Sequence, residues 1–301
     1  MPKLQPIRSR NDVFQLYETL RRNREKRTHM KLYFLEGVHP VEQAIAGGER
    51  FASIAYAEDK RLSGWAEDMI RKAAPEVLHP MPAALLAELS DRENPCELVC
   101  ILHQRTDAEA RLRAAIKGAK APLLVLCDRP ASPGNLGTII RSADAFGACG
   151  VLMTGHAADP YDTQCIRASI GTVFHLPLMA LNSCETAVEF IRSLGDFQIA
   201  GTSAKGTMCF HEADFTRPTV LIVGNETFGM SKAWKEACDL LLRIPIYGAA
   251  SSLNVGEAIH LSADIENRDA LFRLVYRSGN KEYSSFITYD ELGDSIVLTN
   301  G

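Results

Sequence analysis

The sequence contains no apolar run that approaches the roughly 18 residues needed to cross a bilayer. Its first residues also lack the apolar segment that precedes the cleavage site of a signal peptide. These absences argue against an integral membrane protein and against a secreted one. We therefore expect a cytoplasmic protein without a membrane partner.

Paired metal-binding cysteines are missing as well. Eight cysteines are scattered along the chain without one C-x-x-C spacing, whereas structural zinc usually takes four ligands from closely spaced pairs. Cys96, Cys100 and His103 come nearest to a metal triplet, but they are one ligand short. We expect no metal. Cys127 and Cys149 lie in apolar runs, which is typical of small core residues in a reducing compartment.

Internal repeats and low-complexity tracts are absent, and the composition is that of a globular protein. Apolar residues make up 46% of the chain and charged residues 23%, which excludes disorder over most of its length. Because one domain typically takes about 100 to 200 residues, a chain of 301 residues predicts two domains.

The net charge of −4 conceals a basic N-terminal segment. In the first 31 residues nine basic residues face three acidic ones, a local charge of +6 that leaves −10 for the remainder. Apolar residues at helical spacing predict that 11–30 is helical. Such an asymmetry favours an arm that binds phosphate, although a solvated helical face is the alternative. The candidate phosphate contacts are Arg21, Arg22, Arg24, Lys26 and Arg27.

Changes of pattern divide the chain into five parts. The basic arm, 1–30, is followed by a compact α/β domain over 31–105. Residues 106–121 are rich in alanine and charge, which predicts an exposed helical linker. The second domain takes 122–270, and 271–301 form a C-terminal extension.

The second domain is expected to contain a parallel sheet with helices on both faces. Its apolar positions are continuous within each run, which is typical of strands buried on both sides, and helical stretches separate the runs. The expected strands are 123–127, 150–153, 173–178 and 219–224.

The first of three motifs is "SPGNLGTIIRSADAFGACG", over 132–150. A Pro-Gly turn leads into a helix whose expected N-cap is Asn135. Apolar residues share one face of this helix, and at 100° per residue Arg141 projects from nearly the opposite side. An arginine in that position is either a solvated residue or an anion contact.

The second motif, "TVLIVGNETFGMS" over 219–231, predicts a buried strand that ends in a glycine loop. The spacing of Gly224 and Gly229 nearly matches a phosphate-binding loop, but Met230 stands where that loop has lysine. Glu226 adds negative charge where a phosphate would lie, so the motif argues against a nucleoside triphosphatase.

The third motif, "RIPIYGAASSLNVGEAIHLSADIE" over 243–266, predicts a strand, a turn and then a helix. Glu257, His260 and Asp264 share one side of that helix, which indicates a solvent face. A metal cluster would need further ligands that the sequence does not supply.

In this order and spacing, the three motifs resemble those of the SpoU/TrmH family of the SPOUT superfamily. The matching segments are "NLGTIIRSADAFG", "LIVGNETFGMS" and "IPIYGAASSLNV", and "DPYDTQCIRASIGTVFHLPL" (159–178) resembles the segment between the first two. The resemblance implies an RNA ribose 2'-O-methyltransferase that uses S-adenosylmethionine. It also implies a deep C-terminal trefoil knot in the parallel sheet and a homodimer. The smaller α/β domain, with "FLEGVHPVEQAI", resembles the family's ribosomal-protein-like RNA-binding domain.

The resemblance assigns roles residue by residue. The implied catalytic residues are Asn135, Arg141, Glu226, Ser252 and Asn254. The implied cofactor contacts are Gly201, Thr202, Gly224, Asn225, Gly229, Ile244, Leu253 and Asn254. The RNA contacts are those of the basic arm together with Arg167.

Arginine stays protonated in proteins, so we expect Arg141 to act electrostatically by clamping the phosphate beside the target ribose. The alternative is that the arginine itself accepts the hydroxyl proton. The rival function is a catalytically silent RNA-binding relative, which the presence of all five implied catalytic residues disfavours. The target, ribosomal or transfer RNA, stays open because no motif encodes the shape of an RNA.

Overall fold

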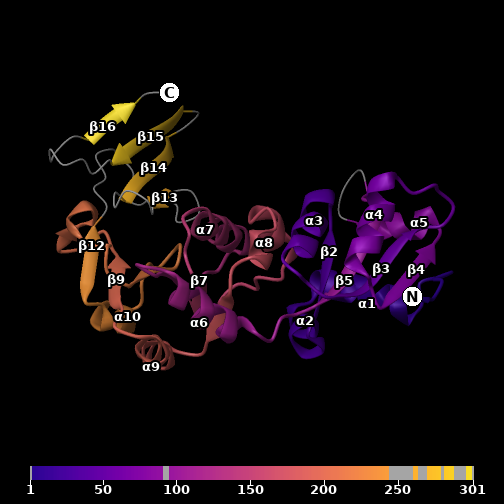
Figure 1. Ribbon diagram of the computed structural model, residues 1–301, viewed down its shortest axis with the longest axis horizontal. Coiled ribbons are helices and arrows are strands. Elements are labelled where there is room, and N and C mark those ends of the chain that lie inside the picture. The colour runs from indigo at the N-terminus through magenta and orange to yellow at the C-terminus, as the bar shows by residue number, and fades with distance from the viewer. Residues whose placement is uncertain are drawn as a thin grey trace. The chain divides into compact units, whose positions relative to one another are not determined.

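The computed structural model describes residues 2–90, 95–243, 260–263, 270–278, 281–287 and 296–299 (Figure 1). The chain separates into two compact units. Unit 1 consists of Met1–Thr106 and Asp159–His175, and unit 2 of Asp107–Ala158 and Leu176–Gly301. None of the helices in the described ranges is long and apolar enough to span a membrane.

Unit 1 contains a five-stranded mixed sheet in the order β1-β4-β3-β5-β2, in which β5 is antiparallel to both neighbours. Its strands are β1 (Lys3–Leu4), β2 (Leu32–Glu36), β3 (Phe51–Ala57), β4 (Val77–Met81) and β5 (Leu98–His103). Its helices are α1 (Asp12–Arg22), α2 (Arg24–Met30), α3 (Val38–Ala46), α4 (Gly64–Ala73), α5 (Ala83–Glu88), α8 (Thr163–Ala168) and the 3-10 helix η1 (Thr172–Phe174).

The basic segment is helical, as predicted, but it is not a separate arm. The side chain of Asn11 caps α1, and that of Asn23, which follows α1, caps α2. Phe14, Tyr17 and Leu20 on α1 are completely buried in the core of unit 1. The apolar face of α1 therefore needs the sheet, and only its polar face remains for a ligand.

The segment Asp159–His175 packs in unit 1, although the sequence indicated that it lies within the second domain. The guanidinium of Arg27 donates to Asp159 at 2.7 Å and to Asp162 at 3.1 Å. The strand expected over 173–178 is displaced, because Val173 and Phe174 belong to η1 and the next strand begins at Leu178. Val173 and Phe174 are buried, and a short run of buried apolar residues has the same sequence pattern as a buried strand.

Unit 2 contains a seven-stranded parallel sheet in the order β10-β12-β9-β11-β6-β7-β8, which confirms the predicted parallel sheet. Its strands are β6 (Leu123–Asp128), β7 (Gly150–Thr154), β8 (Leu178–Leu181), β9 (Gln198–Thr202), β10 (Met208–Cys209), β11 (Thr219–Val223) and β12 (Leu240–Arg243). Its helices are α6 (Ala108–Gly118), α7 (Pro133–Ala145), α9 (Cys184–Leu194), α10 (Lys232–Ala237) and the 3-10 helix η2 (Phe210–Glu212).

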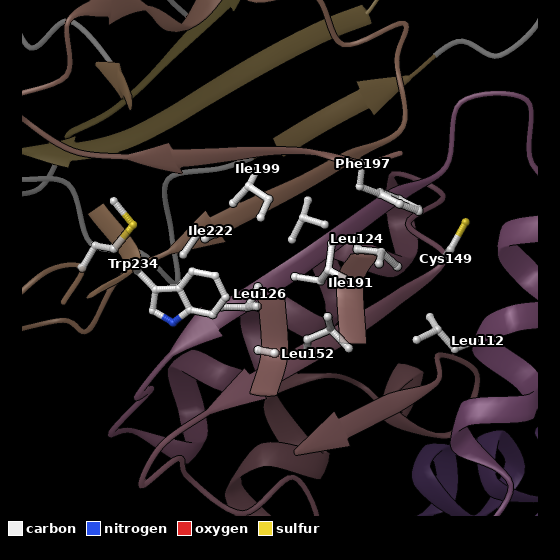
Figure 2. Close-up of a cluster of buried hydrophobic side chains, with 13 residues drawn as sticks. Leu112, Leu124, Leu126, Cys149, Leu152, Ile191, Phe197, Ile199, Ile222 and Trp234 are labelled. Carbon is white, nitrogen blue, oxygen red and sulfur yellow. The ribbon is translucent and has the colours of Figure 1, made fainter. Parts of the chain in front are cut away.

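Helices cover both faces of this sheet. On one face, strand residues such as Leu124 and Ile222 pack with Leu112 of α6, Ile191 of α9 and Trp234 of α10 (Figure 2). Helix α7 adds no residue to that cluster and lies on the other side of the strands in Figure 1. The predicted exposed linker is wrong in one respect: α6 inserts the fully buried Leu112 into the core, since one apolar face suffices to dock an otherwise charged helix.

A four-stranded antiparallel sheet follows, formed by β13 (His260–Ala263), β14 (Ala270–Ser278), β15 (Lys281–Ile287) and β16 (Ile296–Thr299). The helix expected in the third motif is wrong over His260–Ala263, which pairs with β14 instead. Pairing with the next strand along the chain overrides the local helical pattern. The implied C-terminal knot involves residues outside the described ones and stays a prediction.

Candidate functional site

The glycine loop of the second motif meets the start of the first motif at the carboxyl ends of neighbouring strands. Strand β11 lies between β6 and β9, parallel to both. The three strands end at Asp128, Thr202 and Val223. Ligands of open parallel sheets bind at this edge, where loops leave adjacent strands.

Asn225 fixes the loop that leaves β11. It is nine-tenths buried, and its side-chain amide donates to the carbonyl of Arg129 at 2.7 Å. Its Oδ1 accepts from the backbone N–H groups of Thr227 at 2.9 Å and Phe228 at 3.0 Å. Backbone hydrogen bonds of 3.1 and 2.8 Å join Asn225 to Gly229, which adopts a φ of +64°. Hydrogen bonds of Asn225 to Thr227, Phe228 and Gly229 therefore hold the loop 224–229 in one conformation.

Two glycines of the predicted cofactor site are required by packing. A Cβ on Gly224 would lie 2.3 Å from the backbone nitrogen of Met230, and one on Gly201 would lie 2.6 Å from the Cys238 sulfur. The hydroxyl of Thr202 donates to the carbonyl of Ile222 at 3.1 Å, which ties β9 to β11. These contacts account for the residue types, and a cofactor contact remains a prediction for all of them.

Glu226 joins the glycine loop to the first motif. Its carboxylate accepts from the backbone N–H groups of Ala131 at 3.0 Å and Ser132 at 3.3 Å, and from the side-chain amide of Asn135 at 3.1 Å. Partial burial raises the pKa of Glu226, but these donors together outweigh burial and hold that pKa below its ordinary value. Glu226 is thus an ionised carboxylate that positions the entrance of α7.

The N-cap of α7 is Ser132, so the expectation that Asn135 caps this helix is wrong. The Ser132 hydroxyl accepts from the backbone N–H of Asn135 at 3.3 Å, and Pro133 occupies the first helical position. This arrangement releases the Asn135 side chain to reach Glu226.

Arg141 projects from α7 as the sequence predicted. Leu136, Ile139, Ile140 and Ala143 are buried on the apolar face, whereas Arg141 is exposed. Among the described residues its guanidinium has no hydrogen-bond or ion-pair partner. The side chain is therefore available for an anionic ligand.

Sequence reasoning missed Asp128 and Arg129, which brace the same loop. Buried Asp128 accepts from the backbone N–H of Ser231 at 2.7 Å and from Arg129 at 3.1 Å. Arg129 also donates to the carbonyl of Gly229 at 3.3 Å. The only sequence signal was an acidic and a basic residue directly after a buried strand.

Two predicted RNA contacts of unit 1 are corrected by burial. Arg21 is 4% exposed and donates to the carbonyl of Leu89 at 2.6 Å, while Arg27 is 1% exposed and engages the aspartates described above. Both are structural cations, since a side chain so buried cannot also reach a phosphate. The candidates that remain exposed are Arg22, Arg24, Lys26 and Arg167.

The third motif falls largely outside the described residues, and so do Ile244, Ser252, Leu253 and Asn254. In the part of the chain that the structure describes, no group of three or more metal-ligating side chains comes together.

Two family models match the two halves of the chain. Residues 122–263 match the SpoU rRNA Methylase family, and residues 11–100 match the SpoU L30e-like domain. The L30e-like match therefore precedes the methylase match along the chain.

Curated relatives are similar over most of the chain. The 23S rRNA (uridine(2479)-2'-O)-methyltransferase of Streptomyces viridochromogenes is 38% identical, over 85% of this chain and 90% of the relative. The 23S rRNA (guanosine(2553)-2'-O)-methyltransferase RlmP of Bacillus subtilis is 29% identical, over 78% of this chain and 88% of the relative.

A solved structure has the same fold. The SpoU methyltransferase AviRb of Streptomyces viridochromogenes, in complex with AdoMet, matches with a TM-score of 0.74 and 39% identity, over 82% of this chain and 93% of that chain. Sequence motifs, sheet topology and these similarities agree, and the chain belongs to the SpoU rRNA methylase family.

Proposed function

We propose that this protein transfers the methyl group of S-adenosylmethionine to a ribose 2'-hydroxyl of 23S ribosomal RNA. The observation that carries the proposal is a loop that Glu226 fixes to the entrance of α7 at the carboxyl edge of the sheet, together with Arg141 on the same helix, which is exposed and has no hydrogen-bond or ion-pair partner among the described residues. The relatives at 38% and 29% identity that are named as 23S rRNA 2'-O-methyltransferases support it.

The charge at the loop suits S-adenosylmethionine, which supplies an electrophilic methyl group on a sulfonium. Glu226 is ionised, and the groups that bind it are the neutral amides of Ala131, Ser132 and Asn135. A carboxylate with no cation bound to it among the described residues favours a cationic ligand and disfavours a polyphosphate. Thr202, Gly224, Asn225 and Gly229 would hold the cofactor, together with Ile244, Leu253 and Asn254, which lie outside the described residues.

Arg141 and Asn135 would position the RNA. Methylation would join the 2'-oxygen to the methyl carbon as the sulfur–carbon bond breaks, and the hydroxyl proton would pass to the adjacent phosphate or to water. A guanidinium bound to the adjacent phosphate aligns the ribose and favours alkoxide character on the 2'-oxygen. Glu226, as a positioning residue, holds the Asn135 amide in place for this reaction. The motif-three residues Ser252 and Asn254 would complete the catalytic set.

Unit 1 would bind the RNA away from the reacting ribose. Its match to the L30e-like domain supports this role, and exposed cations on two of its helical regions can contact phosphates. We further propose that the protein works as a homodimer, without a metal, and that its second domain carries the knot.

Mapping of ribose methylation tests the function directly. We expect 23S rRNA from cells without the gene to lack one 2'-O-methyl mark, and purified protein with S-adenosylmethionine to restore it in vitro. A titration that detects S-adenosylmethionine binding without any methyl transfer to 23S or transfer RNA would instead support a silent RNA-binding relative.

A further inference from the structure

Phe228 is an exposed aromatic side chain at the tip of the glycine loop. Phe228 is 78% exposed, more than any other large hydrophobic residue in the described ranges. None of the other exposed large hydrophobic residues there is aromatic. A phenylalanine ring that stays in contact with water contributes none of the stabilisation that its burial would give. Fold stability therefore does not explain why phenylalanine occupies this position.

The backbone that carries the ring is fixed by hydrogen bonds. The N–H of Phe228 donates to the buried Oδ1 of Asn225 at 3.0 Å, and the next residue, Gly229, closes the loop through two backbone hydrogen bonds to Asn225. Arg129 donates to the Gly229 carbonyl as well. Because the backbone is already ordered, binding of a flat partner costs conformational entropy only in the two side-chain torsions of the ring.

Its place in the chain puts this ring in the loop that Glu226 joins to α7, beside the proposed reaction site. Phe228 lies two residues after Glu226, whose carboxylate holds Asn135 and the entrance of α7. An RNA whose ribose reaches Asn135 brings its bases close to the same edge of the sheet. Unpaired bases of RNA are commonly bound by stacking on aromatic side chains.

We infer that Phe228 stacks on an unpaired base of the RNA, the target nucleotide or its neighbour, and so acts as a positioning residue for methyl transfer. The inference rests on the proposed function. The ring would add a contact with a base to the phosphate contacts proposed for arginine and lysine. Stacking does not select one base, because every base has a flat face.

Steady-state kinetics on unmodified 23S rRNA transcribed in vitro test the stack. We expect Phe228→Ala to lower kcat/KM for RNA by roughly ten- to a hundredfold. Phe228→Leu, which keeps apolar area without a ring, should stay impaired, and Phe228→Trp should remain within a few fold of wild type. The dissociation constant for S-adenosylmethionine should not change. Leu4→Ala, which removes another exposed apolar side chain, is the control.

Three results would overturn the inference. A Phe228→Leu variant as active as wild type would mean that no ring is needed. Weaker S-adenosylmethionine binding by Phe228→Ala would place the ring against the cofactor, and a shift from dimer to monomer in light scattering would place it in a subunit contact. A wild-type protein that methylates no RNA would instead contradict the proposed function. In that case the tryptophan fluorescence of Phe228→Trp would be titrated with the same RNA and compared with that of wild type. Quenching beyond the wild-type level would show that the ring stacks.

Discussion

At the scale of single residues, the site separates side chains that build it from those that can act. The side-chain oxygens of Glu226, Asn225 and Asp128 accept from backbone N–H groups. Those of Glu226 and Asp128 also accept from the side chains of Asn135 and Arg129, so these residues shape the loop and the helix entrance. Arg141 has no such partner among the described residues. Substitutions of the first group should therefore alter structure and rate together, whereas Arg141 should alter the rate alone.

Replacement of Arg141 tests the electrostatic role. We expect Arg141→Ala to lower kcat by about a hundredfold, which corresponds to roughly 3 kcal/mol of lost transition-state stabilisation. The melting temperature and the affinity for S-adenosylmethionine should stay close to wild type, because the side chain supports no described contact. Arg192→Ala, an exposed arginine on α9, is the control. An unchanged rate would mean that another cation binds the phosphate, and unfolding would favour a structural role.

Protonation of Glu226 should loosen the site in acid. Its donors favour the charged form, so its folded pKa is lowered, and its contribution to stability is complete above the unfolded value of about 4.3. That contribution is lost as the pH falls through the lower folded pKa. We expect Glu226→Gln to melt at a lower temperature at pH 7, because the substituted amide faces N–H donors, and the difference from wild type to shrink below about pH 4. A difference independent of pH would contradict the ionised state.

At the scale of elements, α1 and α2 combine a structural face with an exposed basic one. Buried Phe14, Tyr17 and Leu20 make these helices part of the core of unit 1, so deletion of residues 1–29 would unfold the unit and could not report on RNA binding. Substitution of exposed cations alone is the informative experiment.

The cations concerned are Arg22, Arg24 and Lys26. If each contacts a phosphate, their joint replacement by glutamine should flatten the slope of log K against log salt by about 0.7 to 0.9 for each contact. Glutamine at Lys117, Lys120 and Arg192, which are exposed in unit 2, gives a variant of equal net charge. An equal loss of slope in both variants would show that only net charge matters.

Arg27 should be essential to the stability of unit 1. Its guanidinium donates to Asp159, Asp162 and the carbonyls of Leu20 and Arg21, with only 1% of the residue exposed. Removing one partner of a buried ion pair costs about 3 to 5 kcal/mol because it leaves uncompensated charge. We expect that loss in the free energy of unfolding of Arg27→Ala, measured by urea denaturation. Arg27→Ala combined with Asp159→Asn should cost less than the sum of the two single losses, and strict additivity would show that the pair is not coupled.

At the scale of the whole molecule, the prediction concerns the oligomeric state, which we expect to be a homodimer. We expect light scattering at micromolar concentration to give twice the mass of the 301-residue chain, since obligate dimers often bury more than about 2,000 Å². A monomer at that concentration, with full methyl transfer, would remove the dimer from the proposal.

The sequence by itself determined the α/β class, three of the seven parallel strands of unit 2 (β6, β7 and β11) and the outward position of Arg141. These features follow from local patterns: continuous apolar runs mark buried strands, and 100° per residue places a side chain on a helix. The motif resemblance identified the family on the same local information.

Only the tertiary structure decided which cations are exposed and which polar groups meet. Arg21 and Arg22 are adjacent in the same basic run, yet one is buried and the other is in water, because the sheet covers one face of α1. The contact of Glu226 with Ala131 joins residues 95 positions apart, and Asp159 packs with Arg27 from 132 positions away. Pairings at such separations depend on how the chain returns to itself, which periodicity within a segment does not encode.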